Sequence, residues 1–290
     1  MSERRFCLDK MNNRRWLMDY SDVYSDGTTI MQQAALITGA SSGIGYELAH
    51  VLAREGYDVV LVARREDKLR ALQQSLETQY SIAARTIVVD LTQPDAPQQV
   101  FETVKQWQWS IAILVNNAGF GDHGWFLKSD WMRQQNMILL NILALTHLTH
   151  LFLPDMVTRS QGRILNVAST AAFQPGPLMS VYFASKAYVM SFTEAIANEL
   201  KGTGVTATTL CPGPTQSEFA TAAGLETMGV EGQNLPTSAE VAEFGYRAML
   251  AGQTVAVHGF RNRVLAFLVR FLPRDTMTQL VRQVQEQIAQ

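Results

Sequence analysis

Three side chains capable of acid–base chemistry lie close together in the sequence: Ser169, Tyr182 and Lys186. A tyrosine and a lysine four residues apart share one face of a helix, so the phenol and the ammonium are neighbours. Ser169 follows the apolar run 163–167, and doubly wound folds place their sites at the carboxyl ends of such strands. The set therefore indicates acid–base chemistry at the edge of a sheet.

The chemistry that suits this set is the interconversion of a carbonyl and an alcohol. Hydride transfer to a carbonyl produces an alkoxide, which needs a proton donor close by. Because the ordinary pKa of tyrosine is about 10, proton exchange near neutral pH needs a downward shift of roughly two to three units, or about 3–4 kcal/mol. The charge on Lys186 favours the phenolate and should lower the pKa of Tyr182 in this way. A lone Tyr-x-x-x-Lys pattern arises more often by chance, so the rest of the chain has to support this interpretation.

A glycine-rich turn with the spacing Gly-x-x-x-Gly-x-Gly follows the apolar run 34–37 and precedes a helical pattern. Such glycines let backbone N–H groups approach a diphosphate at the positive end of a helix. The strand before the turn and the helix after it are the context that the motif requires, although an ordinary strand-to-helix turn is the structural alternative. The residues expected at the diphosphate are Gly39, Ser41, Ser42, Gly43, Ile44 and Gly45.

The end of the next predicted strand bears on which nicotinamide cofactor is bound. An NAD site usually carries a carboxylate about 20 residues beyond the glycine turn. Here the strand ends in Ala63, Arg64 and Arg65. A carboxylate would repel a 2′-phosphate, whereas a guanidinium pairs with it through two hydrogen bonds. Arg64, with Arg65, therefore favours NADP(H), and a solvated start of the next helix is the alternative.

Strand and helix patterns alternate along the chain from residue 33. Apolar and β-branched runs predict strands at 34–37, 58–63, 86–89, 111–115, 163–167, 205–210 and 254–257. Helical periodicity predicts helices spanning 44–52, 69–76, 95–106, 130–153, 181–200 and 238–251, with Gly56 just beyond the end of the first. Apolar strands separated by helices imply a parallel sheet covered on both faces. We expect one α/β domain with a doubly wound parallel sheet, a Rossmann fold.

From about Ala34 to Gly259 these motifs resemble the short-chain dehydrogenase/reductase family. The resemblance rests on the glycine spacing, the serine 13 residues before Tyr-x-x-x-Lys, and the run Asn116-Asn117-Ala118-Gly119 after the fourth strand. It implies a catalytic tetrad of Asn141, Ser169, Tyr182 and Lys186. By the same resemblance, serine donates to the substrate oxygen, lysine also bonds the nicotinamide ribose, and Asn141 positions a water for proton resupply.

The resemblance implies further cofactor contacts. Asp90 would bond the adenine ring and Leu91 would flank it. Asn117, Ala118 and Gly119 would stabilise the sheet and wall the cofactor, while Tyr182 and Lys186 would contact it from the catalytic side. Pro212, Gly213 and Thr215 would lie against the nicotinamide, with Pro212 as a rigid wall because its φ is fixed. Plain turns are the structural alternative for both loop segments.

The sequence therefore predicts an NADP(H)-dependent oxidoreductase acting on a small carbonyl or alcohol. An NAD-dependent alcohol dehydrogenase and an NADP(H)-binding regulatory protein on the same fold stay open. A sugar-nucleotide epimerase shares the Tyr–Lys pair but typically has another glycine spacing and a larger C-terminal region. The Ala-, Gly-, Thr- and Met-rich stretch 216–237 is the predicted substrate lid and favours a hydrophobic substrate. Family resemblance adds a homodimer or homotetramer contacting through the helices at 130–153 and 181–200.

Composition limits the other classes. A net charge of −2 and a pI near 6.2 provide no concentrated basic surface for nucleic acid. Cys7 and Cys211 suggest neither a disulfide framework nor a metal site, which suits a reducing cytosol and predicts a cytoplasmic protein. The five histidines show no metal-ligand spacing. The apolar stretch 138–153 looks too short and too polar to span a bilayer.

Two terminal segments flank the predicted catalytic domain at 32–259. Residues 1–31 carry four arginines without a following apolar run, so they predict no signal peptide but a disordered tail or a natural start at Met31. Residues 260–290 predict an amphipathic helical extension. Within it, 260–274 mixes phenylalanine and leucine with four arginines, a pattern that can lie at a membrane surface. Packing on the core or on a partner subunit is the favoured interpretation, since apolar helix faces are normally buried.

Overall fold

The chain divides into two units, residues 1–31 and 32–290. The computed structural model describes residues 33–219, 223 and 235–288. The predicted tail at 1–31 and most of the predicted lid at 216–237 therefore lie outside the described residues. The C-terminal segment 260–288 belongs to the same unit as the predicted catalytic domain.

A seven-stranded sheet forms the centre of the larger unit, in the order β3-β2-β1-β4-β5-β6-β7. All six neighbouring pairs run parallel. The strand order reverses between β1 and β4, which creates the switch point where doubly wound folds bind their ligands. The predicted fold is confirmed. The strands are β1 Gln33–Thr38, β2 Asp58–Ala63, β3 Ala84–Val88, β4 Ser110–Asn116, β5 Gly162–Val167, β6 Val205–Cys211 and β7 Val255–Val257.

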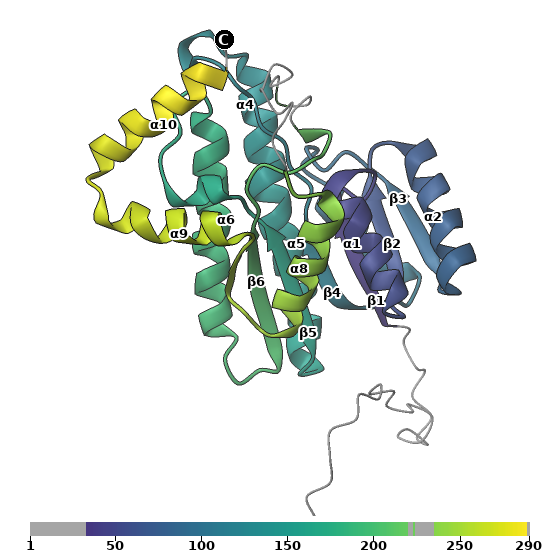
Figure 1. Cartoon of the computed structure of the whole chain (residues 1–290). Helices are drawn as coiled ribbons and strands as arrows, with labels where there is room; N and C mark the ends of the chain where they lie inside the picture. Colours follow the sequence, from purple (N-terminus) through teal and green to yellow (C-terminus); the bar gives the residue numbers. More distant parts are fainter. Residues whose placement is uncertain (1–32, 220–222, 224–234, 289–290) are drawn as a thin grey trace, which may run out of the picture. The chain divides into compact units, whose positions relative to one another are not determined.

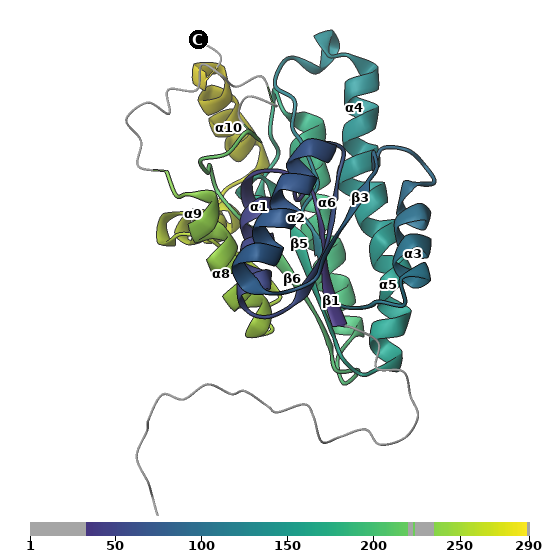
Figure 2. The ribbon, with the colours of Figure 1, turned by 90° about the vertical axis from the view of Figure 1, so that its right-hand side faces the viewer.

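Helices cover both faces of this sheet (Figure 1). Successive strand residues point to opposite faces, so Ala35 and Ile37 pack on one side while Ala34 and Leu36 pack on the other. Figure 2 shows α1 and α8 on one side of the sheet and α3 and α5 on the other. The first layer is α1 Gly43–Arg54, α2 Glu66–Tyr80 and α8 Ser238–Leu250; the second is α3 Ala96–Gln106, α5 Leu145–Thr158 and α6 Ser180–Glu199.

The helix predicted at 130–153 is longer than expected and is interrupted. It runs as α4 Trp131–Ile138, a π-helical segment η3 Leu139–Ala144, and α5. An 18-residue window within 131–158 has a mean hydropathy of 1.6, so by length and composition alone this helix could cross a membrane, and the expectation that it is too short is wrong. In this fold α5 packs its apolar side against the sheet and α3. A π-helical turn within a helix frequently marks a functional position.

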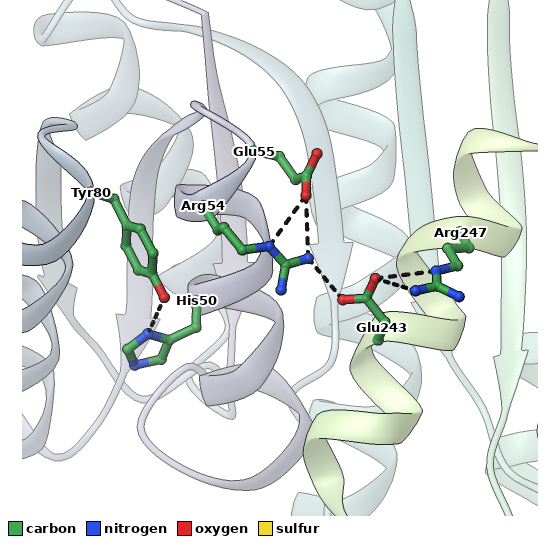
Figure 3. A network of polar contacts seen from close by, with 6 residues as sticks. All are labelled: His50, Arg54, Glu55, Tyr80, Glu243 and Arg247. Atoms are coloured by element: carbon green, nitrogen blue, oxygen red, sulfur yellow. Dashed lines mark hydrogen bonds and ion pairs between the residues drawn. The ribbon is translucent and has the colours of Figure 1, made fainter. Parts of the chain in front are cut away.

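Polar contacts between α1 and α8 supplement their apolar packing (Figure 3). The Arg54 guanidinium binds the Glu243 carboxylate at 2.8 Å and Glu55 at 3.2 Å, and Glu243 also accepts from Arg247 at 2.9 Å. Exposed pairs of this kind contribute about 0–1 kcal/mol each. The buried contacts between the two helices therefore hold α1, and with it the glycine turn, more strongly than the ion pairs do.

The predicted C-terminal extension forms two helices, α9 Phe260–Leu268 and α10 Arg274–Ile288, joined by the short 3-10 helix η5 Val269–Phe271. Pro273 separates them, since proline restricts the residue before it and cannot continue a helix hydrogen-bond pattern. Most apolar side chains of α9 and η5 are exposed. Of the two favoured interpretations, packing on the chain's own core therefore does not describe α9 and η5, whereas packing on a partner subunit stays a prediction.

Candidate active site

The predicted tetrad comes together near the carboxyl ends of the central strands. Ser169 lies two residues beyond β5, Tyr182 and Lys186 lie on α6, and Asn141 lies in η3. Tyr182, Lys186 and Asn141 are all buried. Asn141 lies well before the other three in the sequence, and the fold places all four at one edge of the sheet.

Serine, tyrosine and lysine lie next to one another. A side-chain hydrogen bond joins Ser169 to the Tyr182 phenol. The Lys186 Nζ lies 5.8 Å from the centre of the Tyr182 ring and donates to the Val167 carbonyl at 2.8 Å. The Ser169 Oγ also accepts from the Ala171 N–H at 3.1 Å. Backbone groups thus hold the hydroxyl and the ammonium, and the serine side chain holds the phenol, within one small region.

Asn141 clamps the chain segment beside the lysine. Its Nδ2 donates to the Phe120 carbonyl at 3.0 Å, and its Oδ1 accepts from the Phe120 N–H at 3.1 Å. Nδ2 also donates to the Ser185 Oγ at 3.0 Å, and that hydroxyl donates to the Tyr182 carbonyl at 2.7 Å. A Cβ added at Gly119 would lie 3.0 Å from Asn141 Oδ1 and 3.4 Å from Lys186 Nζ. A side chain at this position would crowd both Asn141 and Lys186, so a glycine leaves room for the two polar groups.

The pKa values at this site do not follow the expectation from the sequence. Burial raises the pKa of Tyr182 to about 12, and the Ser169 hydrogen bond only partly opposes it. Burial lowers the pKa of Lys186 to about 8. Desolvation penalises the charged form of each group, and here it outweighs the attraction between them. The predicted downward shift of the Tyr182 pKa is thus wrong for the protein without a bound cofactor.

Apolar side chains surround the phenol. The Phe219 ring centre lies 5.3 Å from that of Tyr182, and Gly121 brings the chain close to both rings. Met137 of α4, Met179 and Val281 of α10 belong to the same buried cluster. Phe219 is among the few described residues of the predicted lid, and its position agrees with the apolar character expected there.

The glycine turn is packed against the segment after β4. Gly39 and Gly43 have φ of +67° and +57°, a region that side chains disfavour. A Cβ at Gly45 would lie 2.3 Å from the Asn117 Nδ2 and 2.4 Å from the Gly39 carbonyl oxygen. Ser42, at the N-cap of α1, makes no capping hydrogen bond with its side chain. The turn is therefore kept narrow, and the free N–H groups at the N-terminus of α1 are suited to binding an anion.

The Asn-Asn-Ala-Gly run connects β4 to its neighbours. The Thr38 Oγ1 accepts from the N–H groups of Asn117 and Ala118, both at 3.0 Å, and Asn117 Nδ2 donates to the Thr38 carbonyl at 2.9 Å. The Asn116 Nδ2 donates to Asn166 Oδ1 of β5 at 2.9 Å. These contacts support the expected role of the run in stabilising the sheet beside the turn.

The two arginines after β2 differ in their contacts. Arg65, not Arg64, lies on the glycine turn: its Nη2 donates to Ser41 Oγ at 3.0 Å and to Ser42 Oγ at 2.6 Å. Its Nη1 pairs with Glu218 at 2.7 Å, and Lys68 pairs with the same carboxylate at 2.7 Å. Sequence reasoning missed Lys68 and Glu218, since neither belongs to a motif.

Arg64 reaches outward, and its Nη1 lies 3.8 Å from the Asp90 carboxylate. Asp90 Oδ1 accepts from the N–H and the hydroxyl of Thr92, at 3.0 and 2.9 Å. Leu91 is buried in the core with Ile87, and Ile44 packs partly on the opposite core. The Asp90 carboxylate after β3 and the solvated Arg64 guanidinium after β2 therefore lie side by side at the edge of the sheet.

The segment after β6 is held on both sides. The Pro212 carbonyl accepts from the Thr170 N–H at 2.8 Å, which connects this segment to the loop that carries Ser169. The Thr215 Oγ1 donates to the Gly213 carbonyl at 2.9 Å. A Cβ at Gly213 would lie 2.5 Å from the Asn262 Nδ2 of α9, a contact that no local signal in the sequence could have indicated.

The turn and its surroundings fit a dinucleotide. A diphosphate-containing ligand requires glycines that let the backbone approach it and a helix N-terminus with free N–H groups. Both are present here, and the neighbouring cations already bind a carboxylate. A cavity of about 570 Å³ opens beside the turn, lined by Ser42, Lys68 and Glu218 among others. Tyr182 does not line this cavity. The cavity therefore lies beside the glycine turn, where a cofactor would bind, and not next to the phenol.

The short chain dehydrogenase family matches residues 33–227, a span that includes the turn and the tetrad. The chain belongs to this family. As a short-chain dehydrogenase it is 34% identical over 184 residues to an uncharacterised oxidoreductase of Staphylococcus saprophyticus, covering 63% of this chain and 79% of that protein.

Two mammalian relatives of this short-chain dehydrogenase carry more specific names. It is 37% identical over 187 residues to 17-beta-hydroxysteroid dehydrogenase type 3 of Mus musculus, covering 63% of this chain and 60% of that one. It is 33% identical over 182 residues to very-long-chain 3-oxoacyl-CoA reductase of Rattus norvegicus, covering 61% and 58%. The chain thus spans about three-fifths of the length of these two enzymes.

Among solved structures, a short-chain dehydrogenase from Sphingobium yanoikuyae in complex with NADPH superposes with a TM-score of 0.74 at 30% identity, over 82% of this chain and 94% of that one. A bulky-bulky ketone specific alcohol dehydrogenase from Comamonas testosteroni gives 0.71 at 26% identity, over 84% and 93%. Members of the family are oxidoreductases that use NAD(P)(H) on small molecules.

Proposed function

We propose that this short-chain dehydrogenase reduces a hydrophobic ketone or aldehyde to an alcohol with NADPH, and catalyses the reverse oxidation. The observation that carries the proposal is the convergence of Ser169, Tyr182 and Lys186 beside a dinucleotide turn. The reaction adds a hydride to the carbonyl carbon and a proton to its oxygen. The nicotinamide, when bound, supplies the hydride.

The residues of the chain supply the proton and the orientation. Ser169 donates a hydrogen bond to the carbonyl oxygen and holds it beside the Tyr182 hydroxyl. Tyr182 gives its proton to the oxygen as negative charge develops there. With a pKa of about 12, the phenol is neutral at pH 7, which is the form that reduction needs. Lys186 then stabilises the phenolate, and Asn141 holds the segment that lies against the lysine.

The preference for NADP(H) is supported by the anion site on the glycine turn. Arg65 and Lys68 already bind a carboxylate there, and a 2′-phosphate would meet the same two cations. We propose that the phosphate replaces Glu218 as their partner. A related solved structure is in complex with NADPH, which is consistent with this assignment.

A hydrophobic substrate is supported by the side chains next to Tyr182. Met137, Met179, Phe219 and Val281 provide no charged group beside the phenol, so the molecule that carries the carbonyl is apolar there. Two relatives are named for a hydroxysteroid and for very-long-chain 3-oxoacyl-CoA, both substrates with large apolar parts. Binding also excludes water from the reacting atoms.

An oligomer that contacts through α5 and α6 is part of the proposal. On α6, Tyr188 is partly exposed and stacks on Phe192, with 5.9 Å between ring centres. Leu143, at the end of η3, is more than half exposed. A second copy would cover these side chains, and sedimentation of the purified protein would measure the oligomeric state.

The experiment that tests the proposed activity follows NADPH absorbance with a panel of steroid ketones, fatty aldehydes, quinones and 3-oxoacyl thioesters. We expect carbonyl-dependent oxidation of NADPH that falls by roughly a factor of 10³ in Tyr182→Phe. Tyr188→Phe, on the same helix but away from the site, is the matched control and retains the activity. NADPH binding without turnover across the panel would favour a regulatory protein instead.

A further inference from the structure

The segment from α9 to the start of α10 exposes an unusual number of large apolar side chains. Six of them are between 43% and 77% exposed, whereas Ala266 is the single buried apolar residue of α9. In Figure 1 the corner between α9 and α10 projects away from the sheet. We name these six the C-terminal apolar surface: Phe260, Leu265, Phe267, Leu268, Phe271 and Leu272.

Positive charges are interspersed with this surface. Residues 260–274 contain four arginines and no aspartate or glutamate. In the part of the chain that the structure describes, none of the four has an ion-pair partner within 4 Å, in contrast to Arg282 of α10, which pairs with Glu286. The four are Arg261, Arg263, Arg270 and Arg274.

We propose that the C-terminal apolar surface docks on an anionic lipid bilayer, with the phenylalanine and leucine side chains in the headgroup boundary and the arginines on lipid phosphates. Apolar side chains flanked by basic ones are the requirement for binding in the plane of the interface. Two of these side chains, Phe267 and Phe271, contact each other with 5.2 Å between ring centres, and exposed apolar patches mark interaction sites in folded proteins.

Charge complementarity favours a lipid over a second copy of the chain. A two-fold contact through this surface would bring the same patch of both copies together, and each patch carries four arginines and no carboxylate within residues 260–274. Like charges facing each other oppose such a contact. Lipid phosphates pair with the guanidiniums, and acyl chains cover the phenylalanine and leucine side chains.

The position of the surface connects it to the catalytic site. The inner side of α10 contributes Met277 and Val281 to the cluster around Tyr182, and Asn262 of α9 lies against Gly213. The docked face thus adjoins the substrate side of the molecule. The docking itself does not depend on the proposed reaction.

The test is flotation of the full chain with vesicles of phosphatidylcholine alone and of phosphatidylcholine with about one third phosphatidylglycerol. We expect recovery with the anionic vesicles only, and a decrease as salt rises because the charges are screened. The double variant Phe267→Ser, Phe271→Ser should lose most of the recovery, by about tenfold or more. Arg263→Gln with Arg270→Gln should weaken it less.

Leu250→Ser, which alters an exposed leucine at the end of α8, is the matched control and floats like the parent protein. NADPH binding by each variant reports that the fold is retained. Equal flotation of the double serine variant and the parent would overturn the proposal. So would the absence of flotation with anionic vesicles, or a stable dimer that the serine substitutions dissociate.

Discussion

The two ends of the site place their charged groups in opposite surroundings. At the catalytic end Lys186 is only 5% exposed, whereas at the glycine turn the side chains of Arg65 and Lys68 are 43% and 48% exposed. Burial at the first end shifts pKa values and costs stability. Exposure at the second leaves ion pairs weak and exchangeable with water or a phosphate. Stability is thus lost at the end where we propose that a proton moves, while the cations at the anion site can exchange one partner for another.

The largest effect is expected from removing the buried charge. Lys186→Met should lower the rate of carbonyl reduction by roughly 10³-fold, since the phenolate loses its stabilising charge. It should also raise the free energy of unfolding by about 1–2 kcal/mol, because an apolar side chain replaces a desolvated ammonium. Steady-state kinetics and urea unfolding measure the two quantities. A variant that is inactive and also less stable would contradict the burial argument.

Closing the glycine turn should have the next largest effect. Gly45→Ala introduces a Cβ 2.3 Å from Asn117 Nδ2, so the turn must widen and NADPH affinity should fall by about a hundredfold, or about 2.7 kcal/mol. Fluorescence titration measures the affinity. Gly56→Ala, where φ is +87° but no atom lies within 4 Å, is the control. It should lose stability while NADPH affinity stays unchanged.

At the exposed end, Arg65→Gln should discriminate between the cofactors. The KM for NADPH should rise by about ten- to fiftyfold, because a charge-assisted pair with the 2′-phosphate is lost. The KM for NADH, which lacks that phosphate, should change little. Arg64→Gln is the comparison, with a smaller effect because Arg64 does not contact the turn. Equal increases for NADPH and NADH would remove Arg65 from its proposed role.

The pH dependence of catalysis tests the buried end without mutation. Lys186 has a pKa of about 8, so it is charged below that pH and loses its charge as pH rises through it. Tyr182, with a pKa of about 12, stays protonated over the same range. The rate of reduction should therefore be constant near pH 6–7 and fall by up to tenfold per unit above about pH 8. A rate that rises above pH 8 would contradict this assignment.

The smallest effect should come from the surface network between α1 and α8. Arg54→Ala removes the contacts with Glu55 and Glu243 and should lower the free energy of unfolding by about 1 kcal/mol or less. NADPH affinity should stay the same, since apolar packing holds α1. Thermal unfolding and cofactor titration check both. A loss of several kcal/mol would mean that the network carries more of the fold than its exposure suggests.

Local spacing predicted much of this molecule. The β2 strand Asp58–Ala63 begins and ends where the sequence indicates, and Gly56 lies just beyond α1 with a positive φ, as expected. Such features depend on neighbours within a few residues. The parallel order of the sheet followed from apolar strands alternating with helices, a pattern with few alternatives.

What the sequence did not predict depends on contacts between distant segments. The pKa of Tyr182 runs opposite to the expectation because Phe219 and other residues far along the chain bury it. The sequence did not indicate which of the two arginines contacts the turn; Arg65 does so because Ser41, Ser42 and Glu218 converge there. The exposure of α9 depends on whether any other surface covers it, which periodicity alone does not encode.

In the proposed reaction, Tyr182 protonates a carbonyl that receives hydride from the bound cofactor. The most direct test of this step uses NADPH deuterated at the transferred position of the nicotinamide and a carbonyl that the protein reduces. The parent protein and Tyr188→Phe should give an alcohol with deuterium on the carbinol carbon, while Tyr182→Phe binds the cofactor equally well and gives almost none. Formation of the labelled alcohol by Tyr182→Phe at the parent rate would mean that Tyr182 does not supply the proton.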